Sequence, residues 1–457
     1  MTVQRTAVLA ALLLAMPAGL HAETLTVFTA APDQAALKLG SYQSPISGAK
    51  VLNLDVGIGS ALFRSPSAAA NVFYTASDRG PNFTCADAKG LMDLGPEAIC
   101  PEAPGAKVGT GRVYPRADYV VTIYEVTLDP ASKTFKITGS IPLKTPKGSP
   151  IVGLTNPLKV AATETARDGA GQPIPQNINS IDAEGLVRLP DGRFFIGEEN
   201  APGVEEISAD GTIVRRFVPA GTEADFTAAE YPITGSLPAI LALRFSNRGI
   251  ESLSMSDDGK FLYAMVQNPL ANPDAKAYGD AINARLLKLE LGKDGANTTL
   301  KPVAEYVYQL DDWQKFKALG ATDATRANSL RISEMTALGH EHFLVDERTD
   351  QIAKLFEIDL AGATNILGGK WDEKATGPSL EQMDAAATTA AGVVPVKKTE
   401  RLVASSVEGA AKRYPAKIEG LTLTADGKLL MVNDNDFGIA GDTTRFVLVE
   451  GADIGPR

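Results

Sequence analysis

Acidic residues recur beside paired apolar stretches along this chain. The four clearest copies of the pattern lie at residues 181–199, 249–267, 333–348 and 418–436. Each copy has an acidic residue, a short apolar stretch, a tight turn and a second apolar stretch. Carboxylates gathered in one place bind a hard cation, which can polarise a carbonyl or phosphoryl oxygen and lower the pKa of a bound water. The pattern therefore predicts cation-assisted chemistry if the fold brings the copies together.

The carboxylates that border these stretches are the candidates for such a site. Buried carboxylates repel one another and have raised pKa values, so a ring of them needs a cation. Because the chain has only three His and two Cys, oxygen ligands predominate and Ca²⁺ is expected, with Mg²⁺ as the alternative. The expected metal ligands are Asp78, Glu251, Glu347 and Asp434. The expected catalytic residues, one of which would activate water as a general base, are Glu184, Glu198 and Glu419.

Arginine follows an acidic residue at two of these positions. Arg79 comes directly after Asp78, and Arg348 comes directly after Glu347. A guanidinium group binds a phosphate or a carboxylate through two hydrogen bonds. We therefore expect Arg79 and Arg348 to bind a small anionic substrate, such as a phosphoester.

Turn signals separate the paired apolar stretches and identify them as β-hairpins. Asp-Gly occurs at 191–192, 258–259 and 426–427, and it supplies the positive φ that a hairpin turn needs. Residues 60–80 form a weaker fifth copy, and further strand-like runs follow each hairpin. Two hairpins per unit make a four-stranded antiparallel module.

Repeated modules of this kind predict an all-β fold, a β-propeller of five to seven blades, with six slightly preferred. Loop insertions account for the long spacing between copies. Residues 23–457 are expected to form a single domain, with 23–30 as the strand that closes the ring. Because the innermost strand of each blade lines the central channel, the acidic strand ends would converge on one funnel.

Each motif also has a purely structural interpretation. The Glu-Gly pairs at 184–185 and 419–420 could hydrogen-bond the backbone between blades. Residues 77–82 could be only a turn, and 433–436 could be a solvated loop. The sequence contains neither a G-x-S-x-G nucleophile elbow nor a Walker A motif.

The first 22 residues have the pattern of a secretory signal peptide. A single Arg5 precedes the apolar run 7–16, and Pro17 and Gly19 follow it. That run is too short to span a bilayer, and no later stretch has 18 uninterrupted apolar residues. A periplasmic or secreted protein is expected, without an integral membrane segment once the signal is removed. The net charge of −11 argues against nucleic acid as a partner.

The two cysteines fit an exported protein. Cys85 and Cys100 enclose a short loop rich in Gly, Pro and Asp. An oxidising compartment favours a disulfide between them, and two free thiols are the alternative.

Five strings together resemble the bacterial family known as "esterase-like activity of phytase", or the phytase-like domain. The strings lie at 77–82, 182–200, 247–270, 333–348 and 417–438. The resemblance implies an exported β-propeller-like domain, and the family name implies hydrolysis of phosphoesters or related esters. The R-H-G-x-R-x-P signature of histidine acid phosphatases is absent. The likeness to calcium-dependent propeller phytases is one of architecture and acidity.

Three functions agree with these observations. The first is an exported, metal-dependent hydrolase of phosphoesters or related esters, with an acidic funnel as its site. The second is a non-catalytic propeller that binds a metal, a ligand or a protein partner. The third is a calcium-dependent lactonase-type propeller. All three predict an acidic, metal-binding centre.

Overall fold

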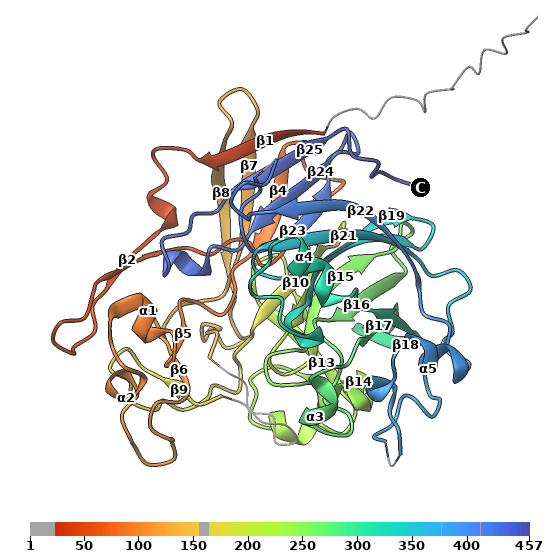
Figure 1. The fold of residues 1–457 in the computed structure, drawn as a ribbon, viewed down its shortest axis with the longest axis horizontal. Helices are drawn as coiled ribbons and strands as arrows, with labels where there is room; N and C mark the ends of the chain where they lie inside the picture. Colours follow the sequence, from red (N-terminus) through yellow and green to blue (C-terminus); the bar gives the residue numbers. More distant parts are fainter. Residues whose placement is uncertain (1–22, 155–163, 376, 412) are drawn as a thin grey trace, which may run out of the picture.

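The fold of this chain is nearly all β in a computed structural model that describes residues 23–154, 164–375, 377–411 and 413–457 (Figure 1). The predicted signal peptide, 1–22, lies outside the described residues. No helix within the described ranges is long and apolar enough to cross a membrane.

Three consecutive antiparallel sheets make up the middle of the chain. The strands of the first are β10 (Ala183–Arg188), β11 (Phe194–Glu198), β12 (Gly203–Ile207) and β13 (Ile213–Pro219), to which β14 (Ile233–Leu237) adds in parallel. Those of the second are β15 (Ile250–Met255), β16 (Phe261–Val266), β17 (Asn283–Asp294) and β18 (Asn297–Gln309). Those of the third are β19 (Arg331–Gly339), β20 (His342–Arg348), β21 (Ile352–Asp359) and β22 (Lys397–Ser405).

The two ends of the chain share the remaining large sheet. Its strand order is β23-β24-β25-β1-β8-β7-β4. The strands are β23 (Ile418–Leu423), β24 (Leu429–Asn433), β25 (Phe446–Glu450), β1 (Thr24–Ala30), β8 (Thr134–Pro142), β7 (Thr122–Asp129) and β4 (Val72–Ala76). Figure 1 shows β1, in red, beside β25 and β24, in blue. β1 pairs antiparallel with β25 and, at Thr29 and Ala30, parallel with β8.

These sheets form five units of a β-propeller-like fold within the described residues, and the unit of β10–β13 carries β14 as a fifth strand. The last unit is β23-β24-β25 completed by β1, as expected for residues 23–30. In the first unit, the segment 58–63 lies inside β4, to which it is joined by the Phe63–Tyr74 bridge. Five lies at the lower end of the predicted range. The preference for six assumed a further unit between Asp78 and Glu198, but that part of the chain supplies β7 and β8 of the first unit and a loop insertion.

Hairpin turns and alternating burial produce these units. Gly192, Gly259 and Gly427 have φ values of 92°, 69° and 78°, so each predicted Asp-Gly turn uses the left-handed conformation that glycine adopts without strain. The inner strands β10, β15 and β19 pack against one another in sequence. Buried Val, Leu, Ile and Phe side chains fill the space between neighbouring sheets.

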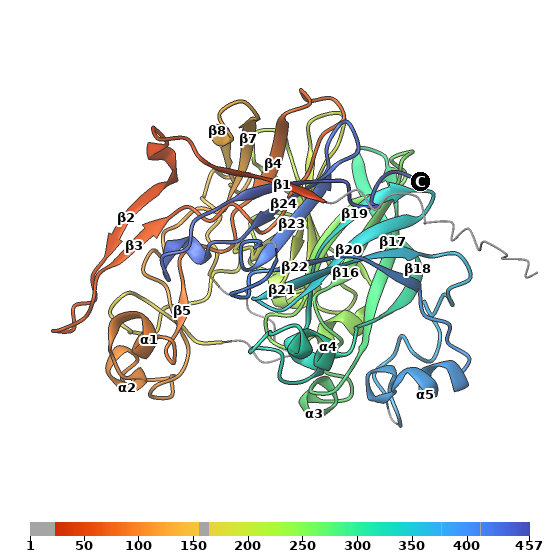
Figure 2. The same ribbon diagram turned by 45° about the horizontal axis from the view of Figure 1, so that its top comes forward.

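Loop insertions lie at one side of the propeller (Figures 1 and 2). The largest contains α1 (Ala88–Met92), α2 (Pro96–Ile99), β5 (Phe83–Thr84), β6 (Arg112–Val113) and β9 (Ala166–Arg167). The predicted disulfide is confirmed there, between Cys85 and Cys100. The other elements are β2 (Lys38–Tyr42), β3 (Leu52–Asp55), α3 (Ala275–Tyr278), α4 (Trp313–Ala318) and α5 (Ala385–Ala390).

Closure of the ring through β1 gives a first testable prediction. Phe28 on β1 is 1% exposed and packs in one cluster with Phe135 and Phe446. Replacing Phe28 by Ala leaves a cavity at the junction of the first and last units, and should lower the free energy of unfolding by about 3–5 kcal/mol. Denaturant titration measures the loss. The exposed neighbour Thr29 provides the control, because Thr29→Ala should change stability by no more than about 0.5 kcal/mol; equal losses in both variants would contradict closure through Phe28.

Candidate functional site

A charged cavity of about 710 Å³ opens where the inner strands begin and the second strands of the units end. Nine acidic and six basic residues line it among the described residues. The acids are Asp78, Asp87, Glu184, Glu199, Glu251, Asp350, Glu419, Asp434 and Asp436. The bases are Arg79, Arg112, Arg248, Arg331, Arg348 and Lys417.

The opposite ends of the inner strands form a cavity of different character. Its volume is about 790 Å³, and its lining includes Leu62, Leu253, Leu338 and Leu423. Ionisable side chains are thus the main lining of the first cavity, whereas the second is lined mostly by uncharged side chains, together with the charged Arg64, Arg188, Asp257, Asp258 and Glu334.

A β-bulge delivers the repeated glutamate of each inner strand. The register of β10 with β11 shifts between Ala183 and Leu186, which leaves Glu184 and Gly185 without direct partners. Equivalent shifts surround Glu251 in β15 and Glu419 in β23. Because a bulge bends its strand and re-aims the extra side chain, these three glutamates turn into the cavity.

Glycine beside the bulge lets neighbouring inner strands approach closely. A Cβ atom at Gly185 would lie 2.3 Å from the backbone nitrogen of Leu253. A Cβ atom at Gly420 would lie 2.8 Å from the carbonyl carbon of Ala61. No side chain fits at those distances, so the Glu-Gly pairs combine a re-aimed carboxylate with close packing of adjacent units.

The fourth repeated glutamate has the structural role instead. Glu334 also lies in a bulge, between Ile332 and Met335. Its carboxylate accepts hydrogen bonds from the backbone nitrogens of Met335, at 3.0 Å, and Leu62, at 3.3 Å. The hydrogen bond to Leu62 joins two units, which is the kind of backbone contact that the sequence left open for the Glu-Gly pairs at 184–185 and 419–420, although Met335 follows Glu334.

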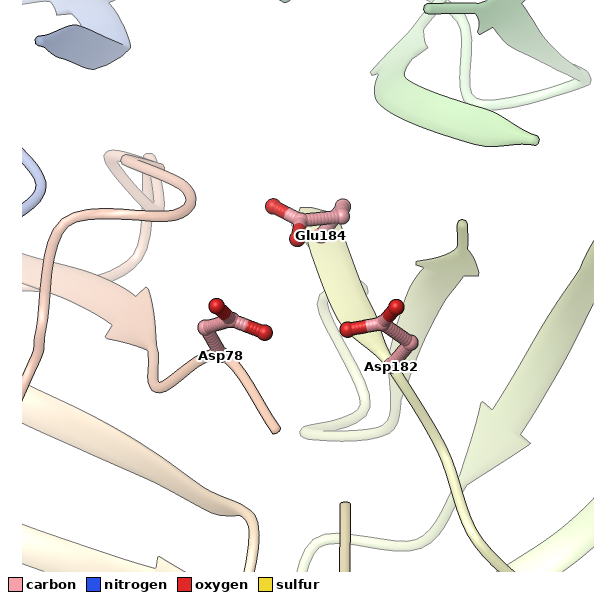
Figure 3. A group of neighbouring side chains, drawn as sticks. All are labelled: Asp78, Asp182 and Glu184. Carbon is pink, nitrogen blue, oxygen red and sulfur yellow. The ribbon is translucent and has the colours of Figure 1, made fainter. Parts of the chain in front are cut away.

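Two groups of three carboxylates meet at the floor of this end of the propeller. Figure 3 shows Asp78, Asp182 and Glu184 pointing toward one another, the first from the loop after β4 and the others from the start of β10. One oxygen from each lies within 4.8 Å of the others. Glu184, Glu199 and Glu251 form a second group with the same spacing. These oxygens could surround a cation without moving far.

Burial and mutual repulsion make these acids hard to ionise. Burial raises the pKa of Asp78 to about 7, and the neighbouring Asp182 carboxyl adds to the shift. Burial likewise raises the pKa of Glu199 to about 7 against the opposing charge of Arg248. The pKa of Glu184 lies well above its usual value because the group is buried and faces Glu251. A carboxylate cluster in this state gains most from a bound cation.

Basic side chains pair with the outer acids of the cavity. Arg348 contacts Glu419 and donates to the Ser333 hydroxyl at 2.7 Å. Lys417 Nζ lies 3.0 Å from an Asp434 oxygen. Arg331 pairs with Asp350, and its Nε atom is buried without a hydrogen-bond partner. These basic side chains therefore lie next to individual acids of the cavity.

Most of the predicted site residues meet in this cavity. Those that line it are Asp78, Arg79, Glu184, Glu251, Arg348, Glu419 and Asp434. Their separate roles as ligand, base or substrate contact stay predictions. Two predicted residues, Glu198 and Glu347, lie elsewhere.

Glu198 and Glu347 are fully buried away from the cavity lining. Glu198 accepts hydrogen bonds from the backbone nitrogens of Asp182 and Ala201, each at 2.9 Å. Glu347 accepts from the Tyr308 hydroxyl at 2.8 Å. Their contacts hold loops and neighbouring strands in place, so the structure does not bring these two carboxylates to the predicted funnel.

The pleat of the second strands explains this difference. Glu198 pairs with Ala183 across the hairpin, just as Val266 pairs with Ile250 and Asn433 with Ile418. The residue after each of these faces the cavity, and these residues are Glu199, Gln267 and Asp434. Successive side chains of a strand point to opposite faces. The register of β11 therefore decides whether Glu198 or Glu199 faces the cavity, and a shift of one residue would exchange them.

Sequence reasoning missed several cavity residues, among them Gln267 and Arg248. Gln267 occupies the position of Glu199 in the next unit, but it stands nine residues after Asp258 whereas Glu199 stands eight after Asp191, so only the strand pairing reveals the equivalence. Arg248 lies two residues before the start of β15, and its guanidinium group is 3.2 Å from Glu199. It stands in a loop without a counterpart in the other copies.

The fold and its axial acidic cavity define a β-propeller-like protein with a candidate cation site. The chain belongs to the Phytase-like family, described as esterase-like activity of phytase, whose model matches residues 56–437. The resemblance seen in the sequence is therefore confirmed.

Individual relatives are more distant. An uncharacterized secreted protein of Arthroderma benhamiae is 30% identical over 151 residues, which are 29% of this chain and 27% of that protein. A luciferin-regenerating enzyme has 10% identity and a TM-score of 0.33, with 95% of this chain and 98% of that chain covered. Regucalcin of Agrobacterium tumefaciens, a calcium-binding protein, has 12% identity and a TM-score of 0.31, with 88% and 96% covered.

The raised pKa values give a second prediction, for the protein in the presence of a chelator. Folded Asp78 and Glu199 keep protons up to about pH 7, whereas the unfolded chain releases them near pH 4. The folded state therefore binds more protons between these values, and this stabilising contribution is lost as the pH rises toward 7 and beyond. The melting temperature should fall between pH 5 and pH 8.

A variant at the centre of the cluster tests the cause. Glu184→Gln removes a carboxyl group whose pKa is raised in the folded protein, so the melting temperature of the variant should fall less steeply over the same pH range. Glu290→Gln, at an exposed position on β17, should keep the full slope. Identical slopes in Glu184→Gln and the unaltered protein would show that the cluster does not govern this pH dependence.

Proposed function

We propose that this protein is an exported hydrolase that uses a divalent cation, Ca²⁺ or Mg²⁺, to cleave phosphoesters or related esters of a small anionic substrate. The observation that carries the proposal is one cavity that nine acidic and six basic side chains line together within the described residues. Acidic side chains alone would repel an anion, and basic side chains alone would not hold a metal. Membership of the Phytase-like family supports ester hydrolysis.

Export is supported by two observations. The chain has a disulfide between Cys85 and Cys100, which suits an oxidising compartment. The fungal relative is described as secreted. Both agree with the signal-peptide pattern of residues 1–22, so the substrate would be met in the periplasm or outside the cell.

The acidic and the basic side chains of the cavity would have different roles in the reaction. When bound at the floor, a divalent cation would polarise the ester oxygen and acidify a water molecule. Arg331 and Arg348 would hold the anionic group by charge-assisted hydrogen bonds. Glu419 lies outside both groups of three carboxylates, and its contact with Arg348 fixes its orientation. We assign it the role of general base, accepting the proton of the attacking water.

Glu419→Gln gives a third prediction. Loss of a positioned general base should lower kcat for the preferred ester by roughly 10²- to 10⁴-fold, whereas Glu290→Gln should leave kcat unchanged. The substrates are p-nitrophenyl phosphate, phytate, p-nitrophenyl acetate and a small lactone, each with calcium, magnesium or chelator. Turnover of the lactone alone would replace this proposal by a lactonase-type activity. Absence of any turnover, with calcium still raising the melting temperature, would indicate a non-catalytic binding protein.

Arg331→Met gives a fourth prediction, which concerns substrate charge. Arg331 lines the cavity with an unpartnered Nε atom, and a hydrogen bond to a charged group contributes about 1.5–3 kcal/mol. KM for p-nitrophenyl phosphate should rise roughly 10- to 100-fold, and KM for the neutral p-nitrophenyl acetate should change little. A similar rise for both esters would mean that Arg331 acts on the shape of the cavity rather than on an anion.

A further inference from the structure

Glu184 belongs to both groups of three carboxylates at the floor of the cavity. One group adds Asp78 and Asp182, and the other adds Glu199 and Glu251. We infer that the floor holds two divalent cations side by side, bridged by the Glu184 carboxylate. This inference rests on the cation-dependent hydrolase proposed above and deepens it.

The spacing of the oxygens fits one ion per group. Ca²⁺ binds oxygen at about 2.3–2.6 Å, so two ligands on opposite sides of the ion are roughly 5 Å apart. The oxygens within each group all lie within 4.8 Å of one another. This oxygen spacing holds within each group of three carboxylates but not for all five carboxylates together. Two ions would therefore be needed to bind all five carboxylates.

Unpartnered oxygens around Glu251 point independently to a ligand. Gln267 is 5% exposed and lines the cavity, and its Oε1 atom is buried without a hydrogen-bond donor among the described residues. Its side chain hydrogen-bonds the Glu251 carboxylate, whose Oε2 atom is also buried and unpartnered. Leaving such acceptors without a donor costs free energy. A cation beside them would satisfy both.

The two subsites differ in their surroundings. Each group has one arginine that opposes a cation, since the Arg79 guanidinium lies 3.3 Å from an Asp182 oxygen and the Arg248 guanidinium lies 3.2 Å from a Glu199 oxygen. Beside Glu251, the Gln267 amide oxygen is available as a neutral ligand. The ion held by Glu184, Glu199 and Glu251 should therefore bind more tightly. Two metal ions about 3.5–4 Å apart stabilise both the attacking and the leaving oxygen of a phosphoryl displacement, which explains why a phosphoester hydrolase would bridge them.

Manganese titration of the chelator-treated full chain tests the inference without any assay of activity. Mn²⁺ suits oxygen ligands and reports on its neighbours by electron paramagnetic resonance. We expect two bound Mn²⁺ per chain with a spin-coupled spectrum. The variants Glu251→Gln and Asp78→Asn should each bind one Mn²⁺ and show no spin coupling. In the unaltered protein, the subsite beside Asp78 should be the one left empty when Mn²⁺ is limiting.

Matched variants and the hydrolysis assay separate the outcomes. Glu290→Gln should keep two coupled ions, and circular dichroism checks that each variant is folded. One ion per chain, or two ions without coupling, would overturn the bridged pair. Two coupled ions with no turnover of any ester would support the bridged pair and contradict the proposed hydrolase. Ester turnover with a single bound ion would support the hydrolase and contradict the bridged pair.

Discussion

Repulsion between carboxylates at the axis is the interaction that the other parts of this structure must balance. Asp78, Glu184 and Glu251 come from three different units, and each is largely withdrawn from water. Separate strands free to move would relax apart until the charges were solvated. The closed ring removes that freedom because each inner strand packs between two neighbours. The acids then lower their energy by holding protons, by pairing with nearby arginines or by sharing a cation.

The local device that positions the acids is the same in several units. A bulge turns the glutamate side chain toward the axis, and the adjacent glycine in two of the units lets the next strand approach. Where Met335 replaces that glycine, the glutamate at 334 binds backbone groups instead. The glycine is not required for the cavity-facing outcome, because Ser252 follows Glu251 and Glu251 still lines the cavity.

Much of this arrangement could be predicted from the sequence, because it depends on short-range patterns. The Asp-Gly turns, the repeated hairpins, the strand at 23–30 and the pairing of the two cysteines all follow from local chemistry. Register could not be predicted as well. Glu198 and Glu199 are adjacent and chemically alike, and only the pairing of β10 with β11 decides which one faces the cavity. Gln267 was missed for a related reason: an amide carries no charge, and its value as an oxygen ligand appears only once its neighbours are known.

The pairing of β1 with β25 has a kinetic consequence. It joins residues separated by more than 400 positions in the chain, and contacts so distant in sequence form late because the loop they close is entropically costly. Each central sheet can assemble from a continuous segment, whereas Glu419 and Asp434, from the last unit, join the acids of the earlier units when the ring closes. During synthesis and export, the polypeptide would pass through states that already contain hairpins and do not yet contain the complete charged cavity.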